Sequence, residues 1–244
     1  MLEFAGRCTG PARQFFARPM IETETLSPRE IIDLLDAEYG SPPWRPHGDP
    51  MAELVLTILS QNTSDTNSGR AFAQLLSTFP DWESVMAADP RRLQAAIQPG
   101  GLAPTKAPRI QAALAEVRRR RGSFDLSFLA DLSLEEARGW LRSLPGVGPK
   151  TAACVLLFSL GRPALPVDTH VHRVAKRLGL VSSKASAEKA HALLEAILQP
   201  EEVYPFHINL VRHGRRTCLA QRPRCQSCVL RHRCPSAPLY LGQR

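Results

Sequence analysis

The chain has 244 residues, of which 43% are hydrophobic, so it can bury a real core as one large domain or two small ones. Its formal net charge of +8 favours an anionic partner such as nucleic acid, although a merely soluble basic protein carries the same kind of charge. No apolar run approaches the roughly 20 residues needed to cross a bilayer, so we expect no membrane partner.

Residues 1–26 carry no periodic pattern, and we expect them to form a flexible N-terminus. They also lack the continuous apolar segment of a secretory signal, so a cytoplasmic location is expected. The six cysteines fit that location, because four of them are packed between Cys218 and Cys234 and are not spread as in a secreted disulfide scaffold.

Two helices are predicted on either side of a proline-rich linker. Residues 27–30, Ser-Pro-Arg-Glu, combine an N-cap, a first-turn proline and a capping-box glutamate, and Gly40 marks the end of that first helix. Residues 41–50, SPPWRPHGDP, form a stiff linker and a plausible crossing between domains. Asp49 and Pro50 then begin the second helix.

Two polar or glycine-rich loops follow. The run SQNTSD at 60–65 is most simply a loop that caps the next helix. The second loop, at 97–102, is a loose glycine turn, and its spacing alone makes Leu102 compatible with a buried core residue. The helix after that turn ends in four arginines, 118–121, for which a solvated helix end is favoured over DNA contact.

The stretch at 144–178 carries the densest set of signals. Ser133 and Glu136 form the capping-box signature of a short helix, which ends at the turn LPGVG, residues 144–148. One continuous helix is predicted after this turn, with Ala152, Val155, Leu156 and Leu160 on one face. Two helices joined by a tight glycine hairpin are therefore expected.

The hairpin suggests chemistry on a phosphate backbone. Gly146 and Gly148 can take positive φ and let a ligand approach the chain closely. The turn leads into a helix N-terminus, where unpaired N–H groups favour an anion such as phosphate. Lys150 lies in the first turn of that helix, and Asp168 precedes the next one. Taken singly, these features are an ordinary turn, a solvated lysine and an N-cap.

Apolar residues at helical spacing continue to the end of the chain, and no stretch alternates with a period of two. The fold class expected from this pattern is all-α. The three remaining stripes lie at 171–178, 190–197 and 205–210.

Four cysteines form the most specific pattern in the chain. They follow the spacing Cys-x6-Cys-x2-Cys-x5-Cys, at Cys218, Cys225, Cys228 and Cys234. Four close thiolates satisfy one tetrahedral zinc ion or one iron–sulphur cube, and their chemistry alone leaves both open. Two disulfides are the poorest interpretation for a cytosolic protein.

Taken together, the motifs resemble a known family. The hairpin LPGVGPKTA at 144–152, followed by VDTHVHRV at 167–174, resembles the helix-hairpin-helix, Gly/Pro-Asp superfamily of DNA glycosylases, most closely endonuclease III. The cysteine spacing, preceded by HGRRT at 213–217, is similar to the iron–sulphur loop of that family. The resemblance implies a six-helix domain at 45–162 facing a cluster domain made of 27–44 plus 163–244, with DNA in the cleft between them.

The resemblance also implies a role for each site residue. Lys150 would be the nucleophile, Asp168 would stabilise the cationic sugar, and the four cysteines would hold a structural 4Fe–4S cluster. Asn62 would fill the gap left by a flipped base, and Leu102 would enter the opposite strand. The residues implied to contact DNA are Gln61, Asn62, Leu102, Gly146, Val147, Gly148 and Thr151.

Two positions depart from the family pattern. Pro149 stands where the family commonly has Arg, which removes an N–H donor and a charge from the phosphate site. Asn62 stands where the family more often has Gln, which can alter the range of accepted bases. The cluster loop itself carries four arginines that are typical of a phosphate-binding platform: Arg222, Arg224, Arg231 and Arg233.

The sequence therefore predicts a base-excision-repair DNA glycosylase with apurinic/apyrimidinic (AP) lyase activity that removes oxidised pyrimidines. Its partner would be double-stranded DNA with damaged bases or abasic sites, bound by a monomer associated with the nucleoid. One alternative is a glycosylase on the same scaffold for alkylated purines, mismatched pyrimidines or 5-methylcytosine. A non-catalytic, cluster-bearing DNA-binding protein is another, but such a protein needs neither Lys150 nor Asp168.

Overall fold

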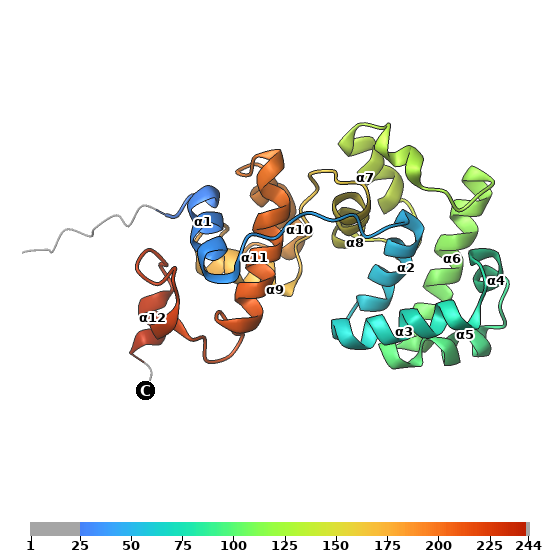
Figure 1. The fold of residues 1–244 in the computed structure, drawn as a ribbon, viewed down its shortest axis with the longest axis horizontal. Helices are drawn as coiled ribbons and strands as arrows, with labels where there is room; N and C mark the ends of the chain where they lie inside the picture. The colour runs from blue at the N-terminus through green and yellow to red at the C-terminus, as the bar shows by residue number, and fades with distance from the viewer. Residues whose placement is uncertain (1–24, 243–244) are drawn as a thin grey trace, which may run out of the picture.

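The computed structural model describes residues 25–242, and within this range the chain forms helices and loops without any strand (Figure 1). The all-α prediction is therefore confirmed. The α-helices are α1 (Pro28–Tyr39), α2 (Pro50–Ser60), α3 (Asp65–Thr78), α4 (Trp82–Met86), α5 (Pro90–Ala96), α6 (Ala103–Arg121), α7 (Leu134–Arg142), α8 (Pro149–Cys154), α9 (Thr169–Arg177), α10 (Ala187–Glu195), α11 (Val203–Arg216) and α12 (Ala237–Leu241).

Several helices begin at the positions that the cap residues in the sequence predicted. The Ser27 hydroxyl accepts a hydrogen bond from the backbone N–H of Glu30, while the Glu30 carboxylate accepts from the N–H of Ser27. Ser133 and Glu136 form the same box at the start of α7, and the Asp49 carboxylate caps α2. Each cap satisfies N–H groups that have no partner within the first turn of a helix.

Buried apolar side chains form two separate cores, which define two lobes. The first lobe, α2 to α8, packs around residues such as Leu54, Ile58 and Ile110. The second lobe joins α1 to α9–α12 and packs around residues such as Ile31 and Phe206. In Figure 1 the lobes lie side by side, and α1 lies against α11 from the far end of the chain.

The first lobe contains seven α-helices, α2 to α8, one more than the six-helix domain that the resemblance implied. The second core also takes up Cys154, Leu157 and Phe158, which precede the expected domain boundary at residue 162. Two cores support a division into two domains, while its boundaries remain a prediction.

The expected flexible N-terminus falls mainly on residues 1–24, which lie outside the described residues. Leu26 is described, and it is buried in the second core at 3% exposure, so the expectation is wrong for this residue.

None of the helices within residues 25–242 is both long and apolar enough to cross a membrane.

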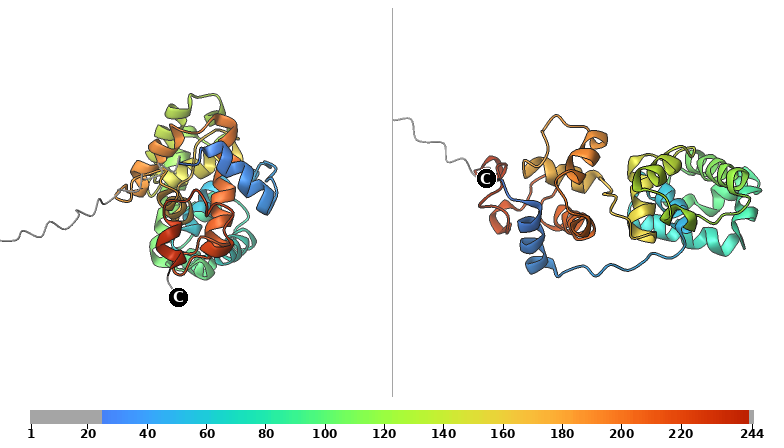
Figure 2. Two further views of the ribbon diagram at one scale, coloured as in Figure 1. Left: turned by 90° about the vertical axis from the view of Figure 1, so that its left-hand side faces the viewer. Right: turned by 90° about the horizontal axis from the view of Figure 1, so that it is seen from above.

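Two segments connect the lobes, at 40–49 and 160–168 (Figure 2). The first is the predicted proline-rich linker, and it is held against the end of the α8 segment. The Trp44 indole N–H donates to the carbonyl of Leu157 (3.1 Å), and the backbone N–H of His47 donates to the carbonyl of Phe158 (2.9 Å). The linker therefore forms part of the junction between the lobes.

Ion pairs also join the lobes. Arg138 of α7 donates two hydrogen bonds to the Glu195 carboxylate of α10, at 2.9 and 3.0 Å, and both side chains are only 18% exposed. Asp65 of α3 and Arg215 of α11 form a second pair, at 2.7 Å, with more exposed side chains. The first pair is a fixed contact, because two parallel bonds to a planar guanidinium set its geometry.

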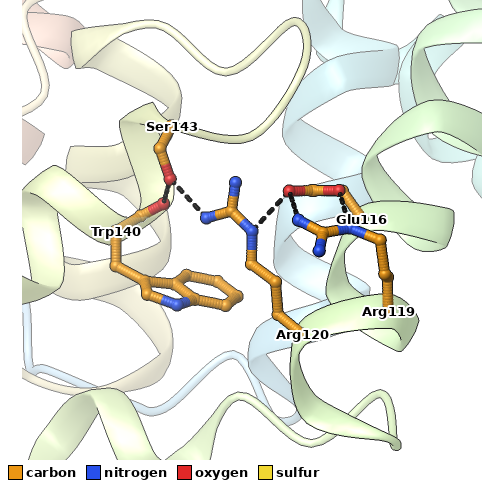
Figure 3. A network of polar contacts seen from close by, with 5 residues as sticks. All are labelled: Glu116, Arg119, Arg120, Trp140 and Ser143. Atoms are coloured by element: carbon orange, nitrogen blue, oxygen red, sulfur yellow. Dashed lines mark hydrogen bonds and ion pairs between the residues drawn. The ribbon is translucent and has the colours of Figure 1, made fainter.

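The four arginines at the end of α6 are exposed, as expected of a solvated helix end, and they also contact neighbouring side chains; Figure 3 shows Arg119 and Arg120. Arg119 and Arg120 share the Glu116 carboxylate, and Arg120 also donates to the Ser143 hydroxyl (2.6 Å) and lies over the Trp140 ring. The outer two are also engaged: Arg118 pairs with Glu83, and Arg121 lies over the Phe128 ring at 3.8 Å.

Candidate active site and cysteine pocket

The predicted glycine hairpin joins α7 to α8. Leu144 and Val147 are buried and anchor it to the first core, while Gly146 is exposed with φ of 76°. A Cβ added to Gly146 would lie 3.3 Å from side-chain atoms of Arg109, so this position needs glycine for both its conformation and its space. Pro149 occupies the first position of α8, where a missing N–H costs nothing.

The helix after the hairpin is not continuous. The α-helix ends at Cys154, and Val155–Ser159 forms a π-helical turn, whereas one continuous helix was predicted. Val155 and Leu156 face the first core, but Leu157 and Phe158 pack in the second. The wider turn therefore lets one segment contribute side chains to the cores of both lobes. Turns of this kind often occur at functional sites.

Lys150 lies at the second position of α8 and is half-buried. Its Nζ is 3.4 Å from the hydroxyl of Ser60, which in turn donates to the carbonyl of Thr57 (2.8 Å). Among the described residues, Lys150 forms no ion pair with a carboxylate. All five lysines of the chain fall in this range, and Lys150 alone among them lines the two pockets between the lobes.

Asp168 is an N-cap, as its simplest interpretation predicted. One oxygen, Oδ1, accepts both the N–H of His170 (2.8 Å) and the N–H of Val171 (2.7 Å) at the start of α9. No hydrogen bond or ion pair within residues 25–242 uses its other oxygen, Oδ2. The cap thus fixes the carboxylate with one oxygen and leaves the second available to the pocket that Asp168 shares with Lys150.

Two pockets lie next to each other between the lobes, with volumes of about 1150 and 960 Å³. Residues of both lobes line each of them. The residues common to both pockets are Ser60, Asp65, Lys150, Asp168 and Arg215. The structure therefore brings the two predicted catalytic residues to the middle of one continuous inter-lobe cleft.

The smaller pocket holds buried acceptors that sequence reasoning missed. Glu53 of α2 is 6% exposed, accepts from the Thr57 hydroxyl (3.1 Å), and lies 3.2 Å from Nδ1 of His47. This contact raises the pKa of His47, whose ring stacks on Phe158. His207 donates through Nδ1 to the Pro166 carbonyl, and burial lowers its pKa to about 4, so its ring is neutral at pH 7. The signal in the sequence that could have revealed this site was Glu53, a glutamate within an otherwise apolar helix.

The hairpin surface also carries a charge that was not predicted. Arg109 of α6 packs on Gly146 and donates to the amide oxygen of Gln61 (3.2 Å), while the Gln61 amide nitrogen is 3.5 Å from the Gly146 carbonyl. The guanidinium therefore lies beside the turn where Pro149 removes the charge typical of the family. Only the tertiary structure brings Arg109 and Gly146 together, since 37 positions separate them.

The remaining predicted DNA contacts divide by exposure. Asn62 is exposed, and Leu102 is 53% exposed, which excludes the core position that its spacing alone had left open. Val147 and Thr151 are buried, at 7% and 3%, so DNA could meet these two residues only through their backbone. Gly148 is half-buried at the N-cap of α8.

The four loop cysteines gather around one pocket of the second lobe, with a volume of about 390 Å³. They line it together with the largely apolar side chains of Val174, Leu178, Leu230, Ala237 and Tyr240, among others. Within residues 25–242, no three His, Cys, Asp or Glu side chains converge closely enough to hold a single metal ion. The pocket nevertheless brings all four predicted ligands to one enclosed space.

Hydrogen-bond donors surround these thiols. The Arg177 guanidinium donates to Sγ of Cys218 (3.3 Å), and Nε2 of the buried His213 lies 3.6 Å from Sγ of Cys228. Burial raises the pKa of Cys228 to about 11 and also raises that of Cys234. Thiolates in this pocket thus need a cationic group beside them, and four thiols spread around one pocket suit an iron–sulphur cluster, which is larger than a single metal ion. The donor set fits such a group.

The predicted phosphate platform of the cluster loop is only partly available. Arg233 pairs with Glu30 of α1 at 2.5 Å, and Arg231 donates to the carbonyl of Gln226. Arg222 and Arg224 are exposed, and neither guanidinium has a hydrogen bond or ion pair within the described residues. The loop therefore uses two of its four arginines to hold itself in place.

Comparison with known proteins agrees with this geometry. Residues 55–200 match the family model described as HhH-GPD superfamily base excision DNA repair protein. An Arabidopsis thaliana relative named as a DNA glycosylase is 43% identical over 195 residues, which cover 80% of this chain and 61% of the relative. Endonuclease III of Thermotoga maritima is 38% identical over 187 residues, covering 76% of this chain and 83% of that protein.

A solved structure of similar shape is that of a trapped endonuclease III–DNA covalent intermediate. It has a TM-score of 0.75 and 29% sequence identity, and the match covers 88% of this chain and 99% of that one. The family model spans more than half of the sequence, including the hairpin and Asp168. The chain therefore belongs to the HhH-GPD superfamily of base excision DNA repair proteins, in which it is similar to endonuclease III.

Proposed function

We propose that this protein is a base-excision DNA glycosylase with AP lyase activity, which removes oxidised pyrimidines from double-stranded DNA. One observation carries the proposal: Lys150 is the lysine of the inter-lobe cleft, and a fixed carboxylate, Asp168, lines the same two pockets. An amine and a carboxylate in one cleft suit Schiff-base chemistry on a sugar, and the Arabidopsis and Thermotoga relatives carry matching names.

The proposed reaction begins with a nucleotide rotated out of the duplex into the cleft. The neutral amine of Lys150 attacks C1′, and the electrons of the C1′–N bond leave with the base, which takes up a proton. Oδ2 of Asp168 stabilises the positive charge that develops on the sugar. The nitrogen then loses a proton and the C1′–O4′ bond breaks, with its electrons going to O4′, which takes up a proton, so that the sugar ring opens to a Schiff base. The Schiff base loses a proton from C2′, and the C3′–O bond breaks with its electrons to release the phosphate attached at C3′, which nicks the strand.

The smaller pocket is the proposed site of the flipped base. Its buried acceptors, the Glu53 carboxylate and the unprotonated Nε2 of His207, suit N–H donors on the hydrogen-bonding edge of a base. A panel of duplexes carrying thymine glycol, uracil, an abasic site or an alkylated purine tests the substrate class. Release of alkylated purines alone would contradict the preference for oxidised pyrimidines.

The four cysteines would hold one 4Fe–4S cluster, which would supply structure to the DNA-facing loop. Purified protein is expected to be yellow-brown, with broad absorbance near about 400 nm, because thiolate-held iron–sulphur clusters absorb there. Cys228→Ser should lose this absorbance, whereas Cys154→Ala, at a buried cysteine outside the pocket, should keep it. A colourless folded protein that contains stoichiometric zinc would show that the metal is different.

Binding is expected to depend strongly on salt, because basic side chains that meet phosphates release counterions. If about five phosphates are neutralised, log K should fall with log salt with a slope of roughly −4 to −5. Arg109→Gln should reduce this slope by about one, while Arg29→Gln, on the exposed face of α1, should leave it unchanged. Equal slopes for the wild type and Arg109→Gln would remove Arg109 from the proposed phosphate site.

A further inference from the structure

Lys106 of α6 is a buried lysine without a carboxylate partner. Its side chain is 1% exposed, and burial lowers its pKa. Nζ donates to the carbonyl of Leu59 (2.6 Å) and to the carbonyl of Gly100 (2.8 Å), and it forms no ion pair within residues 25–242. Burying an amine that has only two backbone carbonyls as partners costs free energy. The two hydrogen bonds offset part of this cost and connect Lys106 to two backbone segments.

The two carbonyls belong to segments that are far apart in sequence. Leu59 lies in the last turn of α2, where carbonyls lack donors from the helix itself. Gly100 ends the short 3₁₀ turn before α6, and it is buried against α3: a Cβ there would lie 3.1 Å from Cβ of Ala71. One ammonium group therefore ties the end of α2 to the turn before α6.

Each tied segment leads directly to a strained, exposed residue. Asn62, three positions after Leu59, has φ of 54°, and Leu102, two positions after Gly100, has φ of 51°. Left-handed conformations are unusual for residues other than glycine and persist only where the surrounding structure enforces them. The carbonyl of Leu102 also accepts the backbone N–H of Lys106 (2.9 Å), so the lysine is fixed to the same turn.

We propose that Lys106 is a positioning residue that sets the distance between Asn62 and Leu102, so that both side chains enter the DNA together. The inference rests on the proposed function and on the roles that the family resemblance implies, in which Asn62 fills the gap left by the flipped nucleotide and Leu102 enters the opposite strand. Two wedges that act on one base pair must keep a fixed separation, because a shift of about 1 Å prevents both from fitting at once.

The competing explanation is that Lys106 only stabilises the first lobe. A double-mutant cycle separates the two, because residues that act as one unit give non-additive effects. Lys106→Met removes the ammonium and keeps the apolar chain, and Leu102→Ala removes one wedge. Leu114→Ala is the matched control, since Leu114 is fully buried on the same helix, eight positions after Lys106.

The measurement uses a duplex with a non-cleavable tetrahydrofuran abasic analogue. 2-Aminopurine is placed beside the orphaned base, so its fluorescence rises when a wedge unstacks that strand, and binding is followed without any chemical step. Lys106→Met is expected to weaken wedge insertion by about 10-fold. In the Lys106→Met background, Leu102→Ala should weaken insertion by less than about a further 2-fold. When Lys106→Met is combined with Leu114→Ala, the separate effects of the two substitutions should multiply.

Insertion by Lys106→Met equal to that of the wild type, or effects that multiply with Leu102→Ala, would overturn the inference. If Lys106→Met does not fold, Lys106→Gln is used. The glutamine side chain is shorter, so its amide can reach only one of the two carbonyls. A wild-type protein that leaves the fluorescence unchanged overturns the wedge pair itself. Normal insertion without base excision would contradict the proposed function and leave the positioning role standing.

Discussion

The Lys150→Gln protein is expected to give no covalent product when borohydride is added to a complex with abasic or lesion-containing DNA. A Schiff base between an amine and the sugar is reducible, and glutamine has no nucleophilic amine. Fold and binding should survive, because the Lys150 side chain forms no ion pair within the described residues, and an amide can replace its long contact to the Ser60 hydroxyl. Denaturing electrophoresis of the reduced mixture measures the trapped fraction.

The other lysines provide the control for this experiment. Lys184→Gln, at an exposed position outside the cleft, should trap as well as the wild type. Lys106 is buried with its Nζ bound to two carbonyls, so it cannot replace Lys150 as the nucleophile. Undiminished trapping by Lys150→Gln would mean that a different amine attacks the sugar and that the hairpin lysine has been misassigned.

Asp168→Asn is expected to fold normally and to excise bases about 30- to 1000-fold more slowly than the wild type, which corresponds to roughly 2–4 kcal/mol of barrier. The structure makes this substitution selective. An asparagine oxygen can replace Oδ1 in both capping bonds to α9, so stability should change by only a few tenths of a kcal/mol. The substitution removes the negative charge of Oδ2.

Single-turnover excision and a thermal melt, measured on the same preparation, test this separation. Asp168→Ala provides the contrast, because it removes both the cap and the charge and should lower the melting temperature as well as the rate. Cluster absorbance should be unchanged in both variants. Full excision activity in a well-folded Asp168→Asn protein would reduce Asp168 to a helix cap and remove half of the proposed active site.

Within the described residues, the features predicted well from the sequence are those decided by neighbours along the chain. Caps at Ser27 and Asp49 define helix starts, because a side-chain oxygen reaches N–H groups two or three residues away. The hairpin glycine Gly146 has the predicted positive φ for the same local reason, whereas Gly148, with φ of −93°, is extended. Cysteine spacing likewise predicted four ligands around one pocket, since the whole set spans a short loop.

Predictions failed where a side chain had a choice of distant partners. Arg120 is exposed as expected, but its hydrogen bond to the Ser143 hydroxyl after the following helix was not predicted. Leu102 could have been core or surface, and the left-handed turn before α6 exposes it. The π-helical turn after Cys154 was missed because the second lobe, absent from any local pattern, draws Leu157 and Phe158 to its own core.

The sequence by itself determined the all-α class, the helix starts, the cysteine set and the pair Lys150 and Asp168, since each follows from short-range spacing. Only the tertiary structure decided how the cleft is completed. It places Arg109 over Gly146, the buried acceptor Glu53 in a pocket that Lys150 and Asp168 also line, and Lys106 between two loops. These contacts join helices that are distant in sequence, so the packing of the lobes, and not local propensity, selects them.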